Sequence, residues 1–232
     1  MKYAYRHWAY TPMKMCCFIQ QIKIELVMKS SVAKALFNSY TYLEYKKIVS
    51  DLLAEGKSSG DDQSEDLLHY TTLNETRLKR LDKTITVPEE ISLKLKALEK
   101  EYIWLVIVEG WCGDGAQILP ILNKMAAESN KIGLKIVFRD SNDDLMNQFL
   151  TNGARAIPKL LIIDKELGKV CKHWGPRPKG ASDLIQNYKE EFGIVDEEAK
   201  AQLQLWYLHD KGLSVQNEVV EMMYSIKECV CL

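Results

Sequence analysis

A single cysteine, Cys112, stands where a run of apolar residues, Ile103 to Val108, gives way to a predicted helix. It belongs to the sequence Trp-Cys-Gly-Asp-Gly at 111–115. Unpaired backbone N–H groups and the helix dipole favour a thiolate at such a junction, which lowers the pKa of a cysteine. Asp114 adds a negative charge that opposes this effect. The position therefore predicts thiol chemistry at Cys112 and leaves the direction of its pKa shift open.

The segments around Cys112 alternate between predicted helices and strands. In chain order they are a helix begun by Pro88, a strand over 103–108, the helix after Cys112, a strand over Leu134–Phe138, a short helix over Asn142–Leu150, a hairpin of Lys159–Ile163 and Lys169–Trp174, and a closing helix over Ser182–Phe192. From the first strand onward the order is β-α-β-α-β-β-α. This order is typical of an α/β fold in which helices sandwich a mixed sheet.

Three further features accompany the cysteine. Pro120 lies eight residues after it, Pro158 lies 46 residues after it in the sequence Arg-Ala-Ile-Pro-Lys, and Gly168 and Gly175 bracket the last strand. Over roughly 89–192 these residues resemble the thioredoxin family, whose signature is Trp-Cys-Gly-Pro-Cys. The resemblance implies a thioredoxin-like mixed sheet sandwiched by helices, here with N- and C-terminal helical extensions. It also implies a cis-proline at Pro158, next to Cys112.

Two positions depart from the family pattern. The resolving cysteine would stand at 115, where this chain has Gly115, and the buried acid at 106, where it has Val106. In a dithiol oxidoreductase the second thiol releases the mixed disulfide, so Cys112 alone would need an outside thiol. We therefore expect monothiol redox exchange or redox sensing rather than standard dithiol chemistry, and whether the protein is an enzyme stays open.

The resemblance also implies a substrate groove at Cys112, the predicted catalytic residue. The expected groove residues are Trp111, Gly113, Asp114, Arg155, Ile157 and Pro158. The backbone at Ile157 would pair with an extended substrate, and such pairing needs no second cysteine. A non-catalytic peptide- or protein-binding module is therefore the alternative function. Iron–sulfur binding through Cys112 and a carrier thiol is a third.

Other side chains near this groove have two interpretations at this stage. Arg155, Lys159 and Arg177 either flank the groove, where they would offer a positive field to a thiolate or an anionic thiol, or belong to an ordinary solvated loop. Asp114 either faces the groove or caps the helix.

The composition narrows the class of protein. The 232 residues carry a net charge of −1 and have 47% hydrophobic content, without the basic patches that nucleic acids require. No apolar run reaches the roughly 18 residues that would span a bilayer. The six cysteines, at 16, 17, 112, 171, 229 and 231, show no repeated spacing. We expect a soluble, cytoplasmic protein without metal or other cofactor, whose partners are proteins or low-molecular-weight thiols; its oligomeric state stays open.

Hydrophobic patterning predicts four regions. They are a poorly ordered leader at 1–28, an N-terminal helix and linker at 29–60, a thioredoxin-like domain at 61–195 and a C-terminal helical extension at 196–232. One long helix is expected over Ser31–Glu55, a flexible connection over Lys57–Glu65, and a short helix over Glu75–Leu81 capped by Asn74. Helices over Glu197–His209 and Ser214–Ile226 are expected to pack with the first helix into a cap, or to offer a partner surface.

Overall fold

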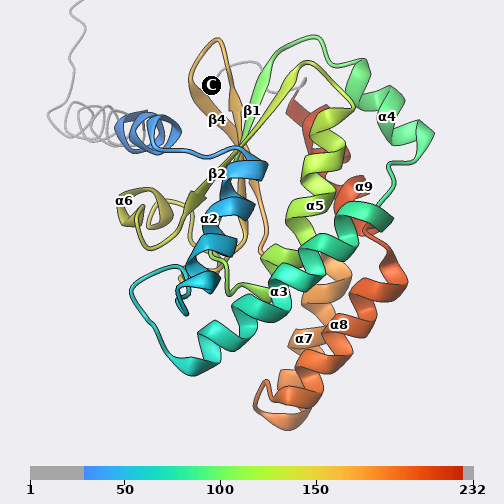
Figure 1. Ribbon diagram of the computed structural model, residues 1–232. Helices are drawn as coiled ribbons and strands as arrows, with labels where there is room; N and C mark the ends of the chain where they lie inside the picture. The colour runs from blue at the N-terminus through green and yellow to red at the C-terminus, as the bar shows by residue number, and fades with distance from the viewer. Residues whose placement is uncertain (1–28, 227–232) are drawn as a thin grey trace, which may run out of the picture.

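The structure, a computed structural model, describes residues 29–226 and is built on one mixed sheet (Figure 1). The four strands are β1 (Tyr102–Val108), β2 (Ile132–Phe138), β3 (Lys159–Asp164) and β4 (Lys169–Trp174), in the order β2-β1-β3-β4. β1 runs parallel to β2 and antiparallel to β3, which pairs antiparallel with β4. The predicted order of strands and helices is confirmed.

The central strand β1 leads to Cys112, which lies just beyond the carboxyl end of the strand. Its sequence, Tyr-Ile-Trp-Leu-Val-Ile-Val, is apolar throughout because both of its faces are covered. Val108 pairs with Phe138 on β2, and Ile107 pairs with Lys159 at the start of β3. The segments after β1, after β2 and before β3 therefore lie together at the same end of the strands.

Helices lie on both sides of the sheet. They are α4 (Glu89–Lys96), α5 (Gly113–Ala127), α6 (Asp143–Met146), α7 (Lys179–Phe192), α8 (Glu197–Asp210) and α9 (Leu213–Ile226). Figure 1 shows α4, α5 and α9 on one side, and α6 with the helical segment at 29–37 on the other. The predicted α/β sandwich is confirmed.

The N-terminal part contains two helices where the sequence predicted one over Ser31–Glu55. A helical segment at 29–37 ends before Tyr40, which exchanges two backbone hydrogen bonds of 2.8 Å with Ile136 on β2. The second helix, α2 (Tyr42–Ala54), follows the N-cap residue Thr41, which forms a capping box with Glu44. The prediction of one helix was wrong because this local start signal and the bridge to β2 interrupt an otherwise continuous helical pattern.

The region after α2 is more ordered than its composition indicated. Ser58 and Ser59, in the stretch predicted as a flexible connection, are 2% and 4% exposed. α3 then runs over Glu65–Thr84, so Asn74 lies in the middle of a helix and does not cap a short one. The inward face of α3 includes the polar side chains of Thr71 and Asn74. A prediction from the spacing of apolar residues alone therefore underestimates the length of this helix.

The sequence predicted that the two C-terminal helices pack with the helix over Ser31–Glu55 into a common cap. The structure places them elsewhere. α8 packs on α7, and α9 packs on α4, α5 and β4, whereas α2 packs on α3 and β2. The face of α9 with Val215, Val219 and Met223 is buried against the central body. The domain limits stay predictions, and the predicted leader and the cysteines at 16, 17, 229 and 231 lie outside the described residues.

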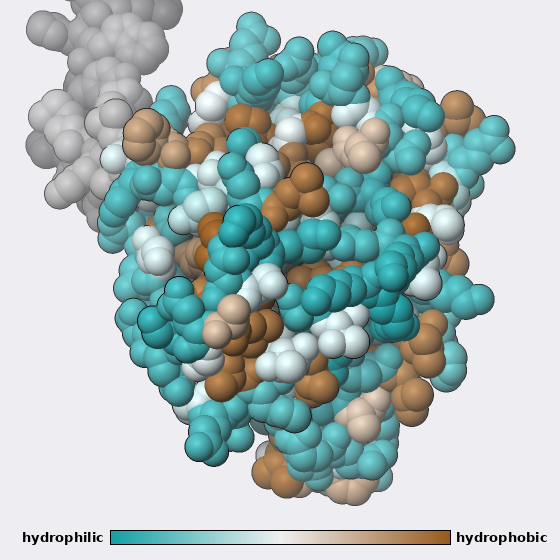
Figure 2. All heavy atoms as spheres, viewed as in Figure 1, coloured by the Kyte–Doolittle hydropathy of each residue, from teal (hydrophilic) through white to brown (hydrophobic). Residues whose placement is uncertain are grey.

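The face of the molecule shown in Figure 2 is largely hydrophilic, with hydrophobic residues in small separate groups. Within residues 29–226, no helix is both long enough and apolar enough to cross a membrane.

Candidate functional site

Cys112 is the N-cap residue of α5, and its sulfur makes two hydrogen bonds with the backbone. Sγ accepts from the N–H of Gly115 at 3.3 Å, and the thiol donates to the carbonyl oxygen of Ile157 at 3.4 Å. Because Cys112 occupies the N-cap, Asp114 does not. The peptide bond between Ile157 and Pro158 is cis. The structure thus brings the predicted catalytic cysteine next to the segment before Pro158.

A groove with a volume of about 890 Å³ opens over this thiol. Of the predicted site residues, Trp111, Cys112, Gly113, Asp114, Arg155 and Ile157 line it, whereas Pro158 is buried and does not. Two helices supply most of the remaining lining. They are α3, with Leu67, His69, Tyr70, Leu73 and Arg77, and α8, with Glu197, Lys200, Ala201, Leu203 and Gln204. Sequence reasoning missed both helices because no local motif relates them to Cys112.

Burial determines the ionisation of Cys112. The residue is 6% exposed, and its desolvation, reinforced by the negative charge of Asp114, raises the pKa of the thiol to about 12. The Gly115 N–H and the guanidinium of Arg177 act in the opposite direction with smaller effect. The thiol form therefore prevails at neutral pH.

Asp114 ties the start of α5 to two distant segments. Its Oδ2 accepts from Arg177 Nε at 2.8 Å and forms an ion pair with Arg177 Nη2 at 2.7 Å, and its Oδ1 accepts from the Tyr207 hydroxyl at 2.8 Å. Burial and the neighbouring Asp114 charge raise the pKa of the Tyr207 hydroxyl, so this group remains a donor. The carboxylate of Asp114 is thus fully engaged with protein groups.

The three basic residues considered from the sequence take different places. Arg177 and the exposed Arg155 line the groove, and Arg155 pairs with Asp143. Lys159 does not flank it. Its side chain is buried and donates to the Thr151 hydroxyl and, at 3.2 Å, to the Gly175 carbonyl. The first residue of β3 points inward at that position, so the flanking interpretation fails for Lys159.

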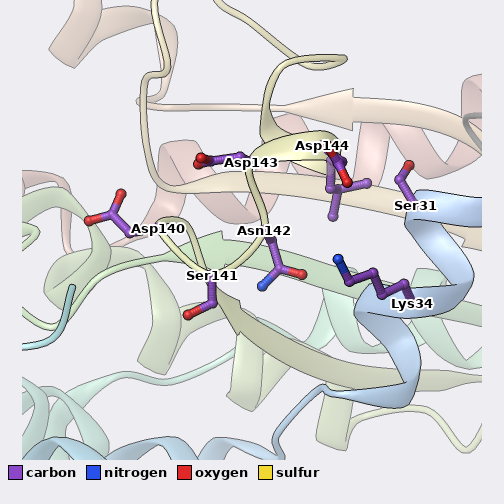
Figure 3. A pocket seen from close by; sticks show the side chains of 8 residues that line it. Ser31, Lys34, Asp140, Ser141, Asn142, Asp143 and Asp144 are labelled. Carbon is purple, nitrogen blue, oxygen red and sulfur yellow. The ribbon is translucent and has the colours of Figure 1, made fainter. Parts of the chain in front are cut away.

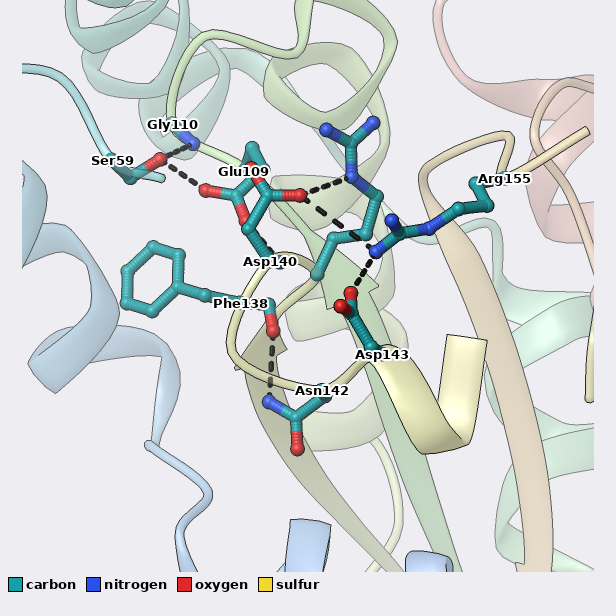
Figure 4. A network of polar contacts seen from close by, with 9 residues as sticks. Ser59, Glu109, Gly110, Phe138, Asp140, Asn142, Asp143 and Arg155 are labelled. Carbon is teal, nitrogen blue, oxygen red and sulfur yellow. Dashed lines mark hydrogen bonds and ion pairs between the residues drawn. The ribbon is translucent and has the colours of Figure 1, made fainter. Parts of the chain in front are cut away.

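A buried acid that the sequence did not reveal lies three residues before Cys112. Glu109 accepts from the Ser59 hydroxyl and, at 2.9 Å, from the N–H of Asp140, while Ser59 accepts from the Gly110 N–H at 2.8 Å (Figure 4). Burial raises the pKa of Glu109 despite these hydrogen bonds. The network holds the segment after α2 against the end of β1.

A second, smaller hollow of about 170 Å³ lies between the helical segment at 29–37 and the loop after β2 (Figure 3). It contains Lys34 and the carboxylates of Asp140, Asp143 and Asp144, and it shares no lining residue with the groove at Cys112. In the part of the chain that the structure describes, no group of three or more His, Cys, Asp or Glu residues is arranged to hold a metal ion. Neither Cys112 nor Cys171 forms a disulfide within the described residues.

The sheet order, the cysteine at the start of α5 and the cis-proline segment beside it define a thioredoxin-like protein. The family model described as Thioredoxin matches residues 60–189, more than half of the chain. The chain therefore belongs to the thioredoxin family. Among curated proteins, none matches this sequence.

Two solved structures resemble the fold at low sequence identity. A crystal structure of a protein of unknown function from Pseudomonas aeruginosa superposes with a TM-score of 0.52 at 18% identity, covering 80% of this chain and 98% of that one. An HIV epitope-scaffold superposes with a TM-score of 0.50 at 19% identity, covering 83% of this chain and 100% of that one. Both similarities extend beyond the segment matched by the family model, and at this identity they describe the fold alone.

Proposed function

We propose that the protein is a thioredoxin-fold binding module that holds an extended peptide in the groove at Cys112. The observation that carries this proposal is the segment before Pro158. Within residues 29–226, neither the backbone groups of Ala156 nor the N–H of Ile157 has a hydrogen-bond partner in the protein. Free backbone groups at the rim of a groove suit the addition of a peptide strand.

The size and lining of the groove support the same proposal. A volume of about 890 Å³ falls in the range of roughly 300–1,000 Å³ typical of ligand sites. Apolar and aromatic side chains from α3, from α8 and from the segment before α5 face it, among them Tyr70, Leu203 and Trp111. Such a surface accommodates alternate side chains of an extended peptide, and the backbone at 156–157 fixes its direction.

A second candidate function is monothiol exchange, favoured by the position of Cys112 in the groove wall and by the Gly115 N–H on its sulfur. The thiolate of Cys112 would attack a partner disulfide, one partner sulfur would leave as a thiolate, and an external thiol would later release the mixed disulfide. This step needs an ionised thiol, and the raised pKa of Cys112 opposes it. We therefore rank exchange below binding.

Selection of a phage-displayed random peptide library on the immobilised full chain tests the proposal. Gly113→Leu should place a side chain in the groove without a clash, because the nearest atom to a Cβ at Gly113 is Arg77 Nη1, at 3.7 Å. Gly133→Leu is the matched control, since Gly133 is an exposed residue of β2 and a Cβ there meets nothing within 4 Å. We expect the unmodified protein and Gly133→Leu to enrich a common sequence and Gly113→Leu to lose it. Equal enrichment by Gly113→Leu, or none by the unmodified protein, contradicts the proposal.

The Cys112→Ser variant separates the two candidate functions. Binding without exchange predicts that this variant retains the selected peptides, and that the unmodified protein forms little mixed disulfide with a small aromatic disulfide at neutral pH. Rapid and stoichiometric mixed-disulfide formation at Cys112, read by mass spectrometry, would instead rank exchange first.

A further inference from the structure

The groove at Cys112 is lined by more positive than negative side chains. Five cationic residues line it, namely Arg77, Arg139, Arg155, Arg177 and Lys200, against two carboxylates, Asp114 and Glu197. An excess of positive charge in a partly enclosed groove raises the local concentration of anionic ligands. The question is which of these cations is available to a ligand.

Four of the five already have a carboxylate partner within the protein. Arg177 pairs with Asp114, and Lys200 pairs with Glu197 at 2.6 Å. Arg139 pairs with Asp140, in the loop after β2, at 2.7 Å, and Arg155 pairs with Asp143, the first residue of α6, as Figure 4 shows for Arg155. Their charges are largely compensated.

Arg77 is the exception. Among residues 29–226 it forms no ion pair with a carboxylate, and its hydrogen bond goes from Nη1 to the neutral Oδ1 of Asn74 at 2.7 Å. The nearby charge of Asp114 acts on it, but both oxygens of that carboxylate are engaged by Arg177 and Tyr207. A guanidinium has five N–H donors, so Arg77 keeps donors for a ligand.

The position of Arg77 is fixed rather than left to a flexible side chain. Asn74 is 1% exposed, and its Nδ2 donates to the Gly110 carbonyl at 2.9 Å, which ties α3 to the segment that carries Cys112. Half-buried Arg77 lies over Gly113, where a Cβ would stand 3.7 Å from Nη1. A guanidinium held in place loses less conformational freedom on binding an anion.

We propose that Arg77 binds a carboxylate of the peptide, so that the groove selects acidic peptides. This inference rests on the proposed peptide binding at the same groove. The carboxylate comes from an Asp or Glu side chain or from a peptide C-terminus, because a guanidinium binds both by the same pair of hydrogen bonds.

Peptide arrays with defined charges test this inference on the full chain. Seven-residue peptides with neutral, acetylated and amidated ends carry Glu, Gln or Lys at the centre and randomised small and apolar residues elsewhere. A fourth pool has Gln at the centre and a free C-terminal carboxylate. One charge-assisted hydrogen bond strengthens binding by about tenfold in affinity. We expect the Glu pool to bind about tenfold more tightly than the Gln pool, and the Lys pool more weakly than both.

Three variants assign the preference to Arg77. Arg77→Gln should abolish the difference between Glu and Gln pools while it keeps binding of the Gln pool, and Arg77→Lys should restore part of the difference. Arg80→Gln is the matched control, because Arg80 is exposed on the same helix and does not line the groove. A structural role of Arg77 would weaken all pools alike. If the free-carboxylate pool rivals the Glu pool, the C-terminus is an accepted source of the anion.

The outcomes separate the two proposals. Binding of no pool contradicts peptide binding itself. Equal binding of the Glu and Gln pools, or a Glu preference that persists in Arg77→Gln, overturns the role of Arg77 while peptide binding stands.

Discussion

The sulfur of Cys112 lies 3.4 Å from the carbonyl oxygen of Ile157 and donates its proton to it. A carbonyl can only accept, so this hydrogen bond exists only while Cys112 is a thiol. Together with burial, it favours the protonated form at the position where the sequence indicated reactivity. The protonated thiol therefore weighs against a pre-formed thiolate and favours the proposed peptide binding over thiol exchange.

The alkylation of Cys112 should show this protonation directly. Since burial raises its pKa to about 12, the rate with iodoacetamide should be low at neutral pH and rise only well above the reference value of about 8.5. Peptide mass spectrometry after digestion reads Cys112 separately, with the half-buried Cys171 as an internal comparison. An apparent pKa at or below the reference would contradict the thiol assignment and favour exchange.

Removing the charge of Asp114 should lower the pKa of Cys112. The Asp114 carboxylate is the second largest cause of the raised pKa, and Arg177, which it now pairs with, would be left to stabilise a thiolate. Asp114→Asn should thus alkylate faster than the unmodified protein at about pH 8 to 9. Asp183→Asn, which removes an exposed charge on α7, is the control. No change with Asp114→Asn would show that desolvation alone determines the pKa.

A second cysteine at position 115 should not fit into this fold. A Cβ at Gly115 would lie 2.4 Å from Cγ2 of Val108, and overpacking of this kind costs about 1–3 kcal/mol. Gly115→Cys should therefore lower the free energy of unfolding in urea denaturation, whereas Gly133→Cys should change it little. In a Val108→Ala background the added cost of Gly115→Cys should shrink. An equal cost in both backgrounds would exclude Val108 as the cause.

The buried acid Glu109 should make stability depend on pH. Burial raises its pKa in the folded state, so its contribution to stability is present below the unfolded pKa and is lost as the pH rises through the folded pKa. Relative to the unmodified protein, Glu109→Gln should therefore gain stability as the pH rises above the ordinary glutamate pKa of about 4.3. Urea denaturation at a series of pH values measures the difference, with the exposed Glu89→Gln as control. A constant difference would mean that Glu109 ionises equally easily in both states.

Local signals in the sequence predicted much of the framework. The apolar run at 103–108 predicted the central strand, and the resemblance to thioredoxins, in which Pro158 follows Cys112 by 46 positions, implied that the two lie together. Where predictions failed, a local start signal outweighed a longer helical pattern, or polar packing buried a segment whose composition indicated a flexible connection. Thr41 started a new helix inside a continuous pattern, and Ser59 became buried because its hydroxyl serves Glu109 and Gly110.

The sequence by itself determined the succession of helices and strands along the chain, the helix that follows Cys112 and the lack of a second cysteine at 115, because these depend on residues close together in the chain. Only the tertiary structure decided that α3 and α8 wall the groove, that Arg77 lies over Gly113 and that Cys112 is buried. Those features arise from helices far apart in sequence that pack to bury their own apolar faces. The same packing removes water from Cys112, and desolvation sets the pKa of its thiol.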